Sequence, residues 1–355
     1  MALVGLREDV ELHTFHPSEL ETDVTVNFEP VGIKVTVHPA QCRFLFEYLH
    51  PLARPTIAPL PNRDAGTVAV EADEVLRFGC LEGDFRVTAK RAVYDPQSGG
   101  RPAAFAENGS RAERLALVLN AEEIRRLAEN DDIGAAAASM TRRENAAAVI
   151  VKDGASGAYV FEGEATPRHV PAYPTRSVYK IGSGDVFSAT FAHAWLSGEL
   201  CAPEAADLAS LRTADYVETP AFPLPRIGSR RTPATVRSER RRVLLASRGS
   251  ATSSLWLREE AIRGVQNLGS TIVRVEDSVG RSTSSTAAEH DFDLVLIILH
   301  DIKHAAAEVR AALARGKPVI AFADAPEILD EVRAIGAVAT DDLCSALYLT
   351  QWAPI

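Results

Sequence analysis

The chain has 355 residues, of which 46% are hydrophobic and 24% charged, and its formal net charge is −10. This length predicts two globular units or one large one, and the charge argues against general nucleic-acid binding because a polyanion would be repelled. No apolar run is long enough to cross a bilayer, and the amino-terminal residues are too charged for a secretory signal. The four cysteines lack CxxC spacing and indicate neither a zinc site nor a disulfide framework. We therefore expect a cytoplasmic protein that has no membrane partner.

The first part of the chain is predicted to be β-rich and then α/β. Short alternating runs suggest strands at 10–15, 23–28, 33–38 and 42–49. Buried strands are then predicted at 75–81, 91–95, 115–120 and 147–153, with helices at 121–130 and 130–146 between the last two. Such alternation predicts a parallel sheet with helices on its faces, beside which the β-rich start would form a small separate sheet.

The stretch Gly182–Asp185, GSGD, begins an apolar helix. A helix start of small residues offers backbone N–H groups and a partial positive charge, which bind an anion. The amides of Gly182, Ser183 and Gly184 could offset the charge of a transferred phosphoryl group, while Asp185 accepts the proton of the attacking hydroxyl. Alternatively, the small residues serve close packing and Asp185 is an ordinary helix cap. The residues alone leave both interpretations open.

A second unit is predicted beyond a linker. Residues 223–242 are rich in proline, serine and arginine and read as an exposed connector. After it come five apolar runs, at 243–247, 271–275, 293–299, 317–322 and 336–340. Helical segments are predicted at 255–269, 304–316 and 326–335. Short strands with intervening helices predict a small doubly wound α/β domain over 243–355.

Three ordered motifs resemble those of the PfkB (ribokinase-like) carbohydrate and nucleoside kinases, over about residues 10–223. GSGD with its helix resembles the family's DTxGAGDxF signature. Asn120 and Glu123 resemble its NxxE motif, and Gly154 and Gly157 resemble its TxGxxG turn. Asp95 and Gln97 fall where the family has a strand-end segment near the phosphates.

The resemblance implies a ribokinase-like kinase domain over residues 1–222, with a β lid at about 10–60. It implies ATP- and Mg²⁺-dependent phosphoryl transfer to a hydroxyl of a sugar or nucleoside. Asp185 would be the catalytic base, with Gly182, Ser183 and Gly184 as the anion hole. Asn120 and Glu123 would organise Mg²⁺ through water, and the purine would lie between the Gly154–Gly157 turn and residues 207–219.

The chain also departs from the family's pattern. Tyr179 and Lys180 replace Asp-Thr before the glycines, and Lys180 could contact a phosphate as a point charge. Lys152 stands where the turn motif usually has Thr. The family's first strand and Gly-Gly segment, which contact the sugar, have no counterpart. The acceptor site is therefore expected to be incomplete or to be completed by another element.

Residues 243–347 resemble the nucleoside 2-deoxyribosyltransferase-like family. Glu308 stands where that family has its nucleophilic carboxylate, and Asp291 and Asp293 would contact a ribose hydroxyl. The second hypothesis is therefore cleavage or exchange of an N-glycosidic bond through Glu308, with the first unit as a nucleotide sensor. Glu308 is equally well read as a surface glutamate paired with Arg310. A third hypothesis is a binding module without turnover, and a homodimer is left open.

Overall fold

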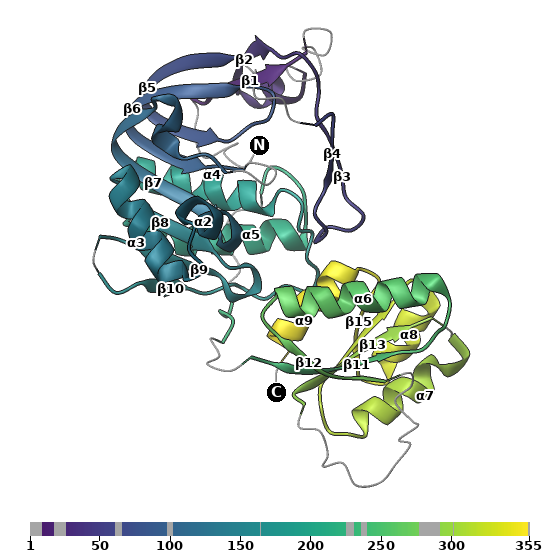
Figure 1. The fold of residues 1–355 in the computed structure, drawn as a ribbon. Coiled ribbons are helices and arrows are strands. Elements are labelled where there is room, and N and C mark those ends of the chain that lie inside the picture. The colour runs from purple at the N-terminus through teal and green to yellow at the C-terminus, as the bar shows by residue number, and fades with distance from the viewer. Residues whose placement is uncertain are drawn as a thin grey trace. The chain divides into compact units, whose positions relative to one another are not determined.

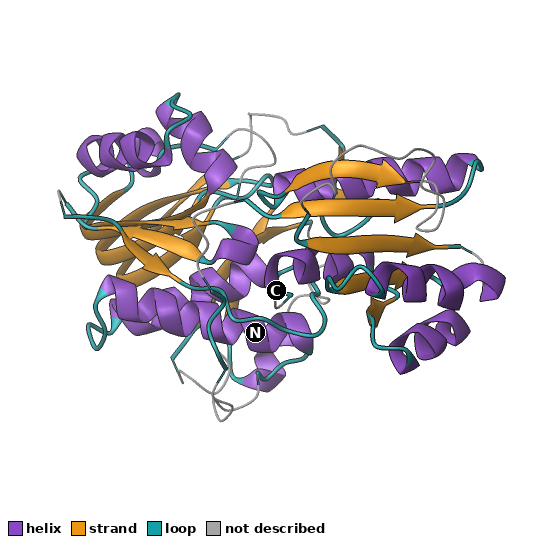
Figure 2. Cartoon of the chain, turned by 90° about the horizontal axis from the view of Figure 1, so that it is seen from below, coloured by secondary structure: helices purple, strands orange, loops and turns teal. Residues whose placement is uncertain are grey.

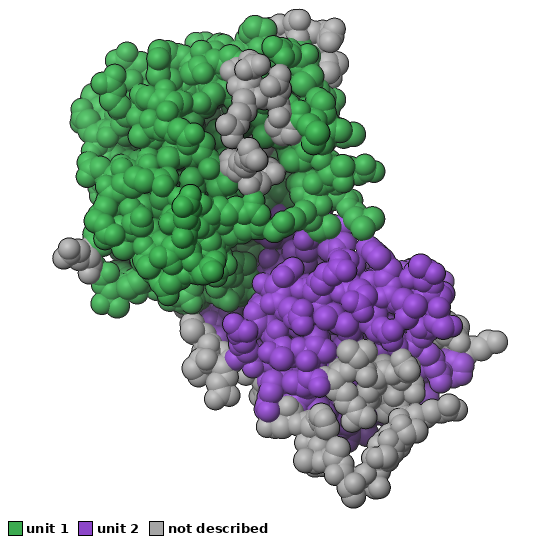
Figure 3. Space-filling model, viewed as in Figure 1, with its two compact units in different colours: residues 1–49, 53–173, 181–231 green, residues 50–52, 174–180, 232–355 purple. Residues whose placement is uncertain are grey.

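The computed structural model describes residues 9–17, 26–60, 66–97, 102–163, 165–224, 231–235, 240–276, 292–300 and 302–353; Figure 1 traces their elements. By their contacts the residues form two compact units (Figure 3). The first comprises Met1–Leu49, Ala53–Tyr173 and Ile181–Arg231, and the second comprises His50–Leu52, Pro174–Lys180 and Thr232–Ile355. The second unit thus takes two short segments from earlier in the chain, which the partition based on sequence did not include.

A six-stranded sheet forms the centre of the first unit, in the order β10-β9-β8-β7-β6-β5. Its strands are β5 (Thr67–Phe78), β6 (Asp84–Asp95), β7 (Arg111–Asn120), β8 (Ala148–Lys152), β9 (Ala158–Phe161) and β10 (Arg168–Val170). Strands β5 to β8 pair in parallel, whereas β9 and β10 are antiparallel additions at one edge. The predicted parallel sheet is confirmed.

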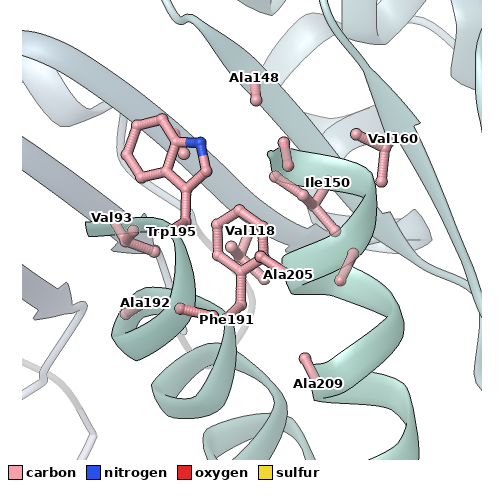
Figure 4. Packing of buried hydrophobic residues seen from close by; sticks show 14 of the residues in the cluster. Val93, Val118, Ala148, Ile150, Val160, Phe191, Ala192, Trp195, Ala205 and Ala209 are labelled. Atoms are coloured by element: carbon pink, nitrogen blue, oxygen red, sulfur yellow. The ribbon is translucent and has the colours of Figure 1, made fainter. Parts of the chain in front are cut away.

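Helices cover both faces of this sheet. On one face, α4 (Ser183–Leu196) and α5 (Ala202–Glu218) pack through an apolar cluster in which Phe191 and Trp195 are fully buried. Figure 4 shows these two rings among Val93, Val118 and Ile150 of the strands. On the other face, α2 (Ala121–Ala128) and α3 (Ile133–Glu144) pack against the alternate strand residues. The α/β fold class predicted for this unit is therefore confirmed.

Strands β5 and β6 are strongly curved. Thr67 pairs with Asp84 and Phe78 pairs with Asp95, in parallel. The link 79–83 can span only about 17 Å, whereas a straight strand of this length would measure about 40 Å. Strand β5 must therefore bend back toward the start of β6, and the side chain of Arg77 accordingly donates to Asp84 Oδ1 at 2.7 Å.

Two small sheets precede the central one. Strands β1 (Glu11–His16) and β2 (Lys34–Pro39) pair in parallel, and β3 (Leu45–Glu47) and β4 (Thr56–Ala58) pair antiparallel. The strand predicted at 23–28 is wrong for its described part, because residues 26–28 are helical and lead into the 3-10 turn η2 (Glu29–Val31). Pro30 is the second residue of this turn and Gly32 ends it in the left-handed region, which favours a helical turn over a strand.

An aromatic cluster joins β1 and β2 to β6. The rings of Phe15 and Phe85 lie 4.6 Å apart, and those of His13 and His38 stack at 5.4 Å. The two imidazoles are also within hydrogen-bond distance, with His13 Nδ1 and His38 Nε2 3.2 Å apart. Burial, and then the neighbouring His13, lower the pKa of His38. The folded protein therefore favours the neutral imidazole of His38.

The β1–β2 sheet is expected to loosen in mild acid. Because the folded-state pKa of His38 lies below the unfolded value of about 6.5, its contribution to stability is present above that value and is lost as the pH falls below it. Hydrogen exchange of the β1 and β2 amides, corrected for intrinsic rates, should be faster at pH 5.5 than at pH 7.5. The His38→Gln variant should show a smaller difference, and an equal difference in both proteins would contradict this.

The second unit is a five-stranded parallel sheet in the order β12-β11-β13-β14-β15. Its strands are β11 (Arg242–Ser247), β12 (Thr271–Glu276), β13 (Leu294–Leu299), β14 (Val319–Ala323) and β15 (Val338–Thr340). Helices α6 (Thr252–Asn267) and α9 (Leu343–Trp352) pack on one face, and α7 (Ile302–Leu313) and α8 (Pro326–Ala334) pack on the other (Figure 2). All five predicted strands are present, whereas α9 was not predicted.

The two earlier segments are built into this second unit. His50 Nε2 lies 3.0 Å from Glu260 Oε2 of α6, and Leu52 packs against the apolar cluster beneath α6 and α9. The buried amide of Val178 donates to Ser345 Oγ at 2.7 Å.

In the described part of the chain no helix combines the length and the apolar character needed to span a membrane.

Candidate functional site

Three central strands end at one edge of the first sheet with a polar residue each. Asp95 is the last residue of β6, Asn120 of β7 and Lys152 of β8. Asn120 and Lys152 are direct neighbours in the register of β7 and β8. In open α/β sheets, ligands bind at the carboxyl ends of the parallel strands. The sheet therefore places these three side chains where a site is expected.

Lys152 and Asp95 form an ion pair at this edge. Lys152 Nζ lies 2.7 Å from Asp95 Oδ2 and 3.5 Å from Ser188 Oγ of α4, and Ser188 itself donates to Asp95 Oδ2 at 2.6 Å. Asp95 and Ser188 are fully buried, whereas the Lys152 side chain is 17% exposed. Burial acts to lower the pKa of Lys152, but the charges of Asp95, Glu123 and Asp185 outweigh it and raise that pKa. Lys152 is therefore positively charged, and its ammonium group is held in place by Asp95 and Ser188.

The first turn of α4 lies beside this cation. Gly182 precedes the helix with φ of 77°, and no side chain caps the helix. A Cβ placed on Gly184 would lie 3.7 Å from Lys152 Nζ. Asp185 is exposed and its carboxylate accepts a hydrogen bond from Gln97 Nε2. Six of the residues expected at the site are thus brought together with Lys152: Asp95, Gln97, Gly182, Ser183, Gly184 and Asp185.

Asn120 and Glu123 form a capping box at the start of α2. Asn120 Oδ1 accepts from the amides of Glu122 and Glu123 at 2.9 Å, and Glu123 Oε2 accepts from the Asn120 amide at 2.7 Å. Burial, only partly offset by Lys152, raises the pKa of Glu123. In the part of the chain that the structure describes, no three His, Cys, Asp or Glu side chains form a group that could hold a metal ion. The box uses Asn120 Oδ1 and Glu123 Oε2, so that Glu123 Oε1 is the oxygen of this motif that could contact a metal through water.

The two glycines of the turn after β8 are needed by the backbone. Gly154 has φ of 53°, and Gly157 has φ of 100°. A Cβ on Gly157 would lie 2.1 Å from the carbonyl oxygen of Val170. The motif therefore allows β9 and β10 to approach closely, and no nucleotide contact is required to account for it.

A cavity of about 1280 Å³ lies against the concave strands of the first unit. Its lining includes Glu11, His13, Phe15, Glu74, Phe85 and Arg91. Phe78 and Cys80 also line it, and the amide of Gly79 between them donates to the carbonyl of Asp95 at 2.8 Å. One end of the cavity therefore adjoins the strand ends that carry Asp95.

Lys180 precedes Gly182 by two positions in the chain. It belongs to the second unit, where its charge acts on the buried Cys344 thiol. Burial, reinforced by Asp342 and only partly opposed by Lys180, raises the pKa of Cys344 to about 12. The phosphate contact expected of Lys180 stays a prediction.

The residues expected at a site in the second unit do not converge. Glu308 Oε1 lies 3.3 Å from Arg248 Nη1, just beyond the carboxyl end of β11, rather than pairing with Arg310. Asp293 precedes β13 and accepts from the Arg242 amide at 2.7 Å, at the amino ends of the strands. Because these are opposite edges of a parallel sheet, Asp293 cannot join Glu308 in one site. Asp291 lies outside the described residues.

Comparison with known proteins links the first unit to a kinase family. Residues 113–212 match the model of the pfkB family carbohydrate kinases. No curated protein matches the chain. Similar solved structures include a Thermotoga maritima ribokinase (19% identity, 61% of this chain and 77% of that one, TM-score 0.43). A Vibrio cholerae fructokinase bound to fructose, ADP and calcium is also similar (11% identity, 58% and 79%, TM-score 0.43).

Proposed function

We propose that the first unit transfers a phosphoryl group from ATP to a hydroxyl of a sugar or nucleoside. The observation that carries this proposal is the position of Asp185, an exposed carboxylate in the first turn of α4, beside the Lys152 cation. The family match over 113–212 supports it, because the matched segment includes Asn120, Glu123 and GSGD.

The residues around α4 suit the demands of phosphoryl transfer, which needs positioning and charge stabilisation more than covalent help. Asp185 would accept the proton of the attacking hydroxyl, and its bond from Gln97 would hold the carboxylate in place. The partial positive charge of the helix start attracts the phosphoryl oxygens. Mg²⁺ bound with ATP would offset donor charge, and Glu123 would hold one of its waters.

The cavity beside β5 and β6 is the best candidate for the acceptor pocket. It adjoins the Asp95 end of β6, and Gln97, two residues further along the chain, contacts Asp185. Carboxylates such as Glu11 and Glu74 and the ring of Phe15 supply hydrogen-bond acceptors and an apolar wall. Those are the groups with which proteins bind polyhydroxylated molecules.

The proposal is tested by incubating the full chain with ATP, Mg²⁺ and a panel of sugars and nucleosides. We expect mass spectrometry to find a phosphorylated product of at least one acceptor, with ADP released in equal amount. Absence of any phosphorylated product across the panel would count against the kinase assignment.

A second candidate function resides in the second unit. The order of its strands reverses between β11 and β13, so that the connections after these two strands run to opposite sides. Ligands of open α/β sheets commonly bind at such a point. Glu308 lies at this edge, with its Oε1 3.3 Å from Arg248 Nη1. We propose it as the group that would attack or stabilise an anomeric carbon.

The wild type is expected to release free base from nucleosides or nucleotides, and the Glu308→Gln variant is expected to lose this release. Chromatography of the reaction mixture measures the base, and Glu327→Gln, an exposed change on α8, is the matched control. Base release that is equal in wild type and Glu308→Gln would exclude Glu308 from the chemistry.

A further inference from the structure

We propose that Lys152 is a catalytic residue that binds the transferring phosphoryl group, and that Asp95 and Ser188 position it. This inference rests on the kinase function proposed above. It assigns part of the stabilisation of the phosphoryl charge to Lys152, which stands where the PfkB turn motif usually has Thr. The ammonium group is held at the carboxyl end of β8, over the first turn of α4.

The hydrogen bonds of Lys152 leave one donor for a ligand. An ammonium carries three N–H groups, and within the described residues Lys152 donates to Asp95 Oδ2 and to Ser188 Oγ. The side chain is 17% exposed, so its remaining N–H can reach a bound molecule. Its two protein partners fix the nitrogen in place, because both are fully buried and bonded to each other.

The helix start beside Lys152 suits an anion. The amino end of a helix carries a partial positive charge, which disfavours a neighbouring cation. Lys152 nevertheless lies beside the first turn of α4, where a bound anion would interact favourably with both positive groups, as the Asp95 carboxylate already does with Lys152. Among the residues that the structure describes, the buried Asp95 Oδ1 has no hydrogen-bond partner.

The chemical step follows from these positions. The acceptor oxygen attacks the terminal phosphorus of ATP, and its proton passes to Asp185. A new O–P bond forms as the bond from that phosphorus to the bridging oxygen breaks, and ADP leaves with the bonding electrons. Lys152 stays protonated throughout. It donates one hydrogen bond to a non-bridging oxygen of the transferring phosphoryl group, which carries much of the negative charge of the transition state.

The test compares wild type, Lys152→Met and Lys317→Met, the last being a lysine of the second unit outside the proposed site. Calorimetric titration with ATP, and separately with inorganic pyrophosphate, should show at least a tenfold loss of affinity in Lys152→Met only. Turnover with the best acceptor should fall about 10²-fold or more, the usual effect of removing one such donor. Equal affinity and turnover in wild type and Lys152→Met would overturn the proposal, and so would a wild type that binds neither anion.

The roles of the positioning residues are tested by a double-mutant cycle. Ser188→Ala should lower kcat severalfold in the wild type and have no effect in the Lys152→Met background, because Ser188 acts through Lys152. Additive losses in the double variant would show that Ser188 is merely structural. If anions bind in a Lys152-dependent way but no acceptor is phosphorylated, the kinase function fails while the anion site stands.

Discussion

Replacing Asp185 by Asn is expected to lower kcat for phosphoryl transfer by about 10²-fold or more, the usual cost of removing a general base. The amide has nearly the shape of the carboxylate and can still accept the hydrogen bond from Gln97. It cannot take the proton of the attacking hydroxyl. Because the exposed side chain of Asp185 contributes little to the core, folding should be unaffected.

Steady-state rates at saturating ATP and acceptor would measure this loss. The KM for ATP should change little, since the amides of the helix start and Lys152 remain in place. Asp131→Asn, an exposed change beside α3, provides the matched control and should retain full activity. Should Asp185→Asn turn over as fast as the wild type, Asp185 is not the base.

Gly157→Ala is expected to destabilise the first unit by more than about 3 kcal/mol. Its backbone, with φ of 100° and ψ of −123°, lies in a region that residues with a side chain rarely adopt. The new Cβ would also overlap the carbonyl oxygen of Val170 at 2.1 Å. That carbonyl belongs to the backbone of β10, so relief requires β9 and β10 to move apart.

Gly163→Ala separates these two effects. Gly163 also has positive φ, 58°, but a Cβ there would meet no atom within 4 Å, so only about 1–2 kcal/mol of backbone strain is expected. Of the three tryptophans in the chain, Trp195 alone belongs to the first unit. Its fluorescence in a Trp256→Phe, Trp352→Phe background would follow urea unfolding of that unit. Similar midpoints for Gly157→Ala and Gly163→Ala would refute the steric argument.

Features set by neighbouring residues were predictable from the sequence. The helix after GSGD begins at Ser183 because small residues and an apolar period mark it locally. The five strands of the second unit were equally recognisable, since each is a short apolar run between polar turns. The strand predicted at 23–28 failed because the turn chemistry of Pro30 and Gly32 outweighed the alternating pattern before it.

Pairings between distant residues were not predictable. Lys152 and Asp95 are 57 positions apart, and only the parallel register of β6, β7 and β8 brings them to one edge. A lysine at the end of an otherwise apolar strand, directly before the glycine turn, was the available signal. The prediction that Asp293 shares a site with Glu308 failed for a related reason. Their separation along the chain does not reveal that they lie at opposite edges of the sheet.

The segments 50–52 and 174–180 make the second unit depend on residues that are translated before its main part, residues 232–355. A fragment that starts at the arginine-rich connector would lack the amide that Ser345 accepts from, the imidazole facing Glu260 and the leucine beneath α6. During synthesis, these two segments therefore leave the ribosome before the helices against which they pack. A chimaera that replaces the first unit by that of another protein must therefore keep residues 50–52 and 174–180.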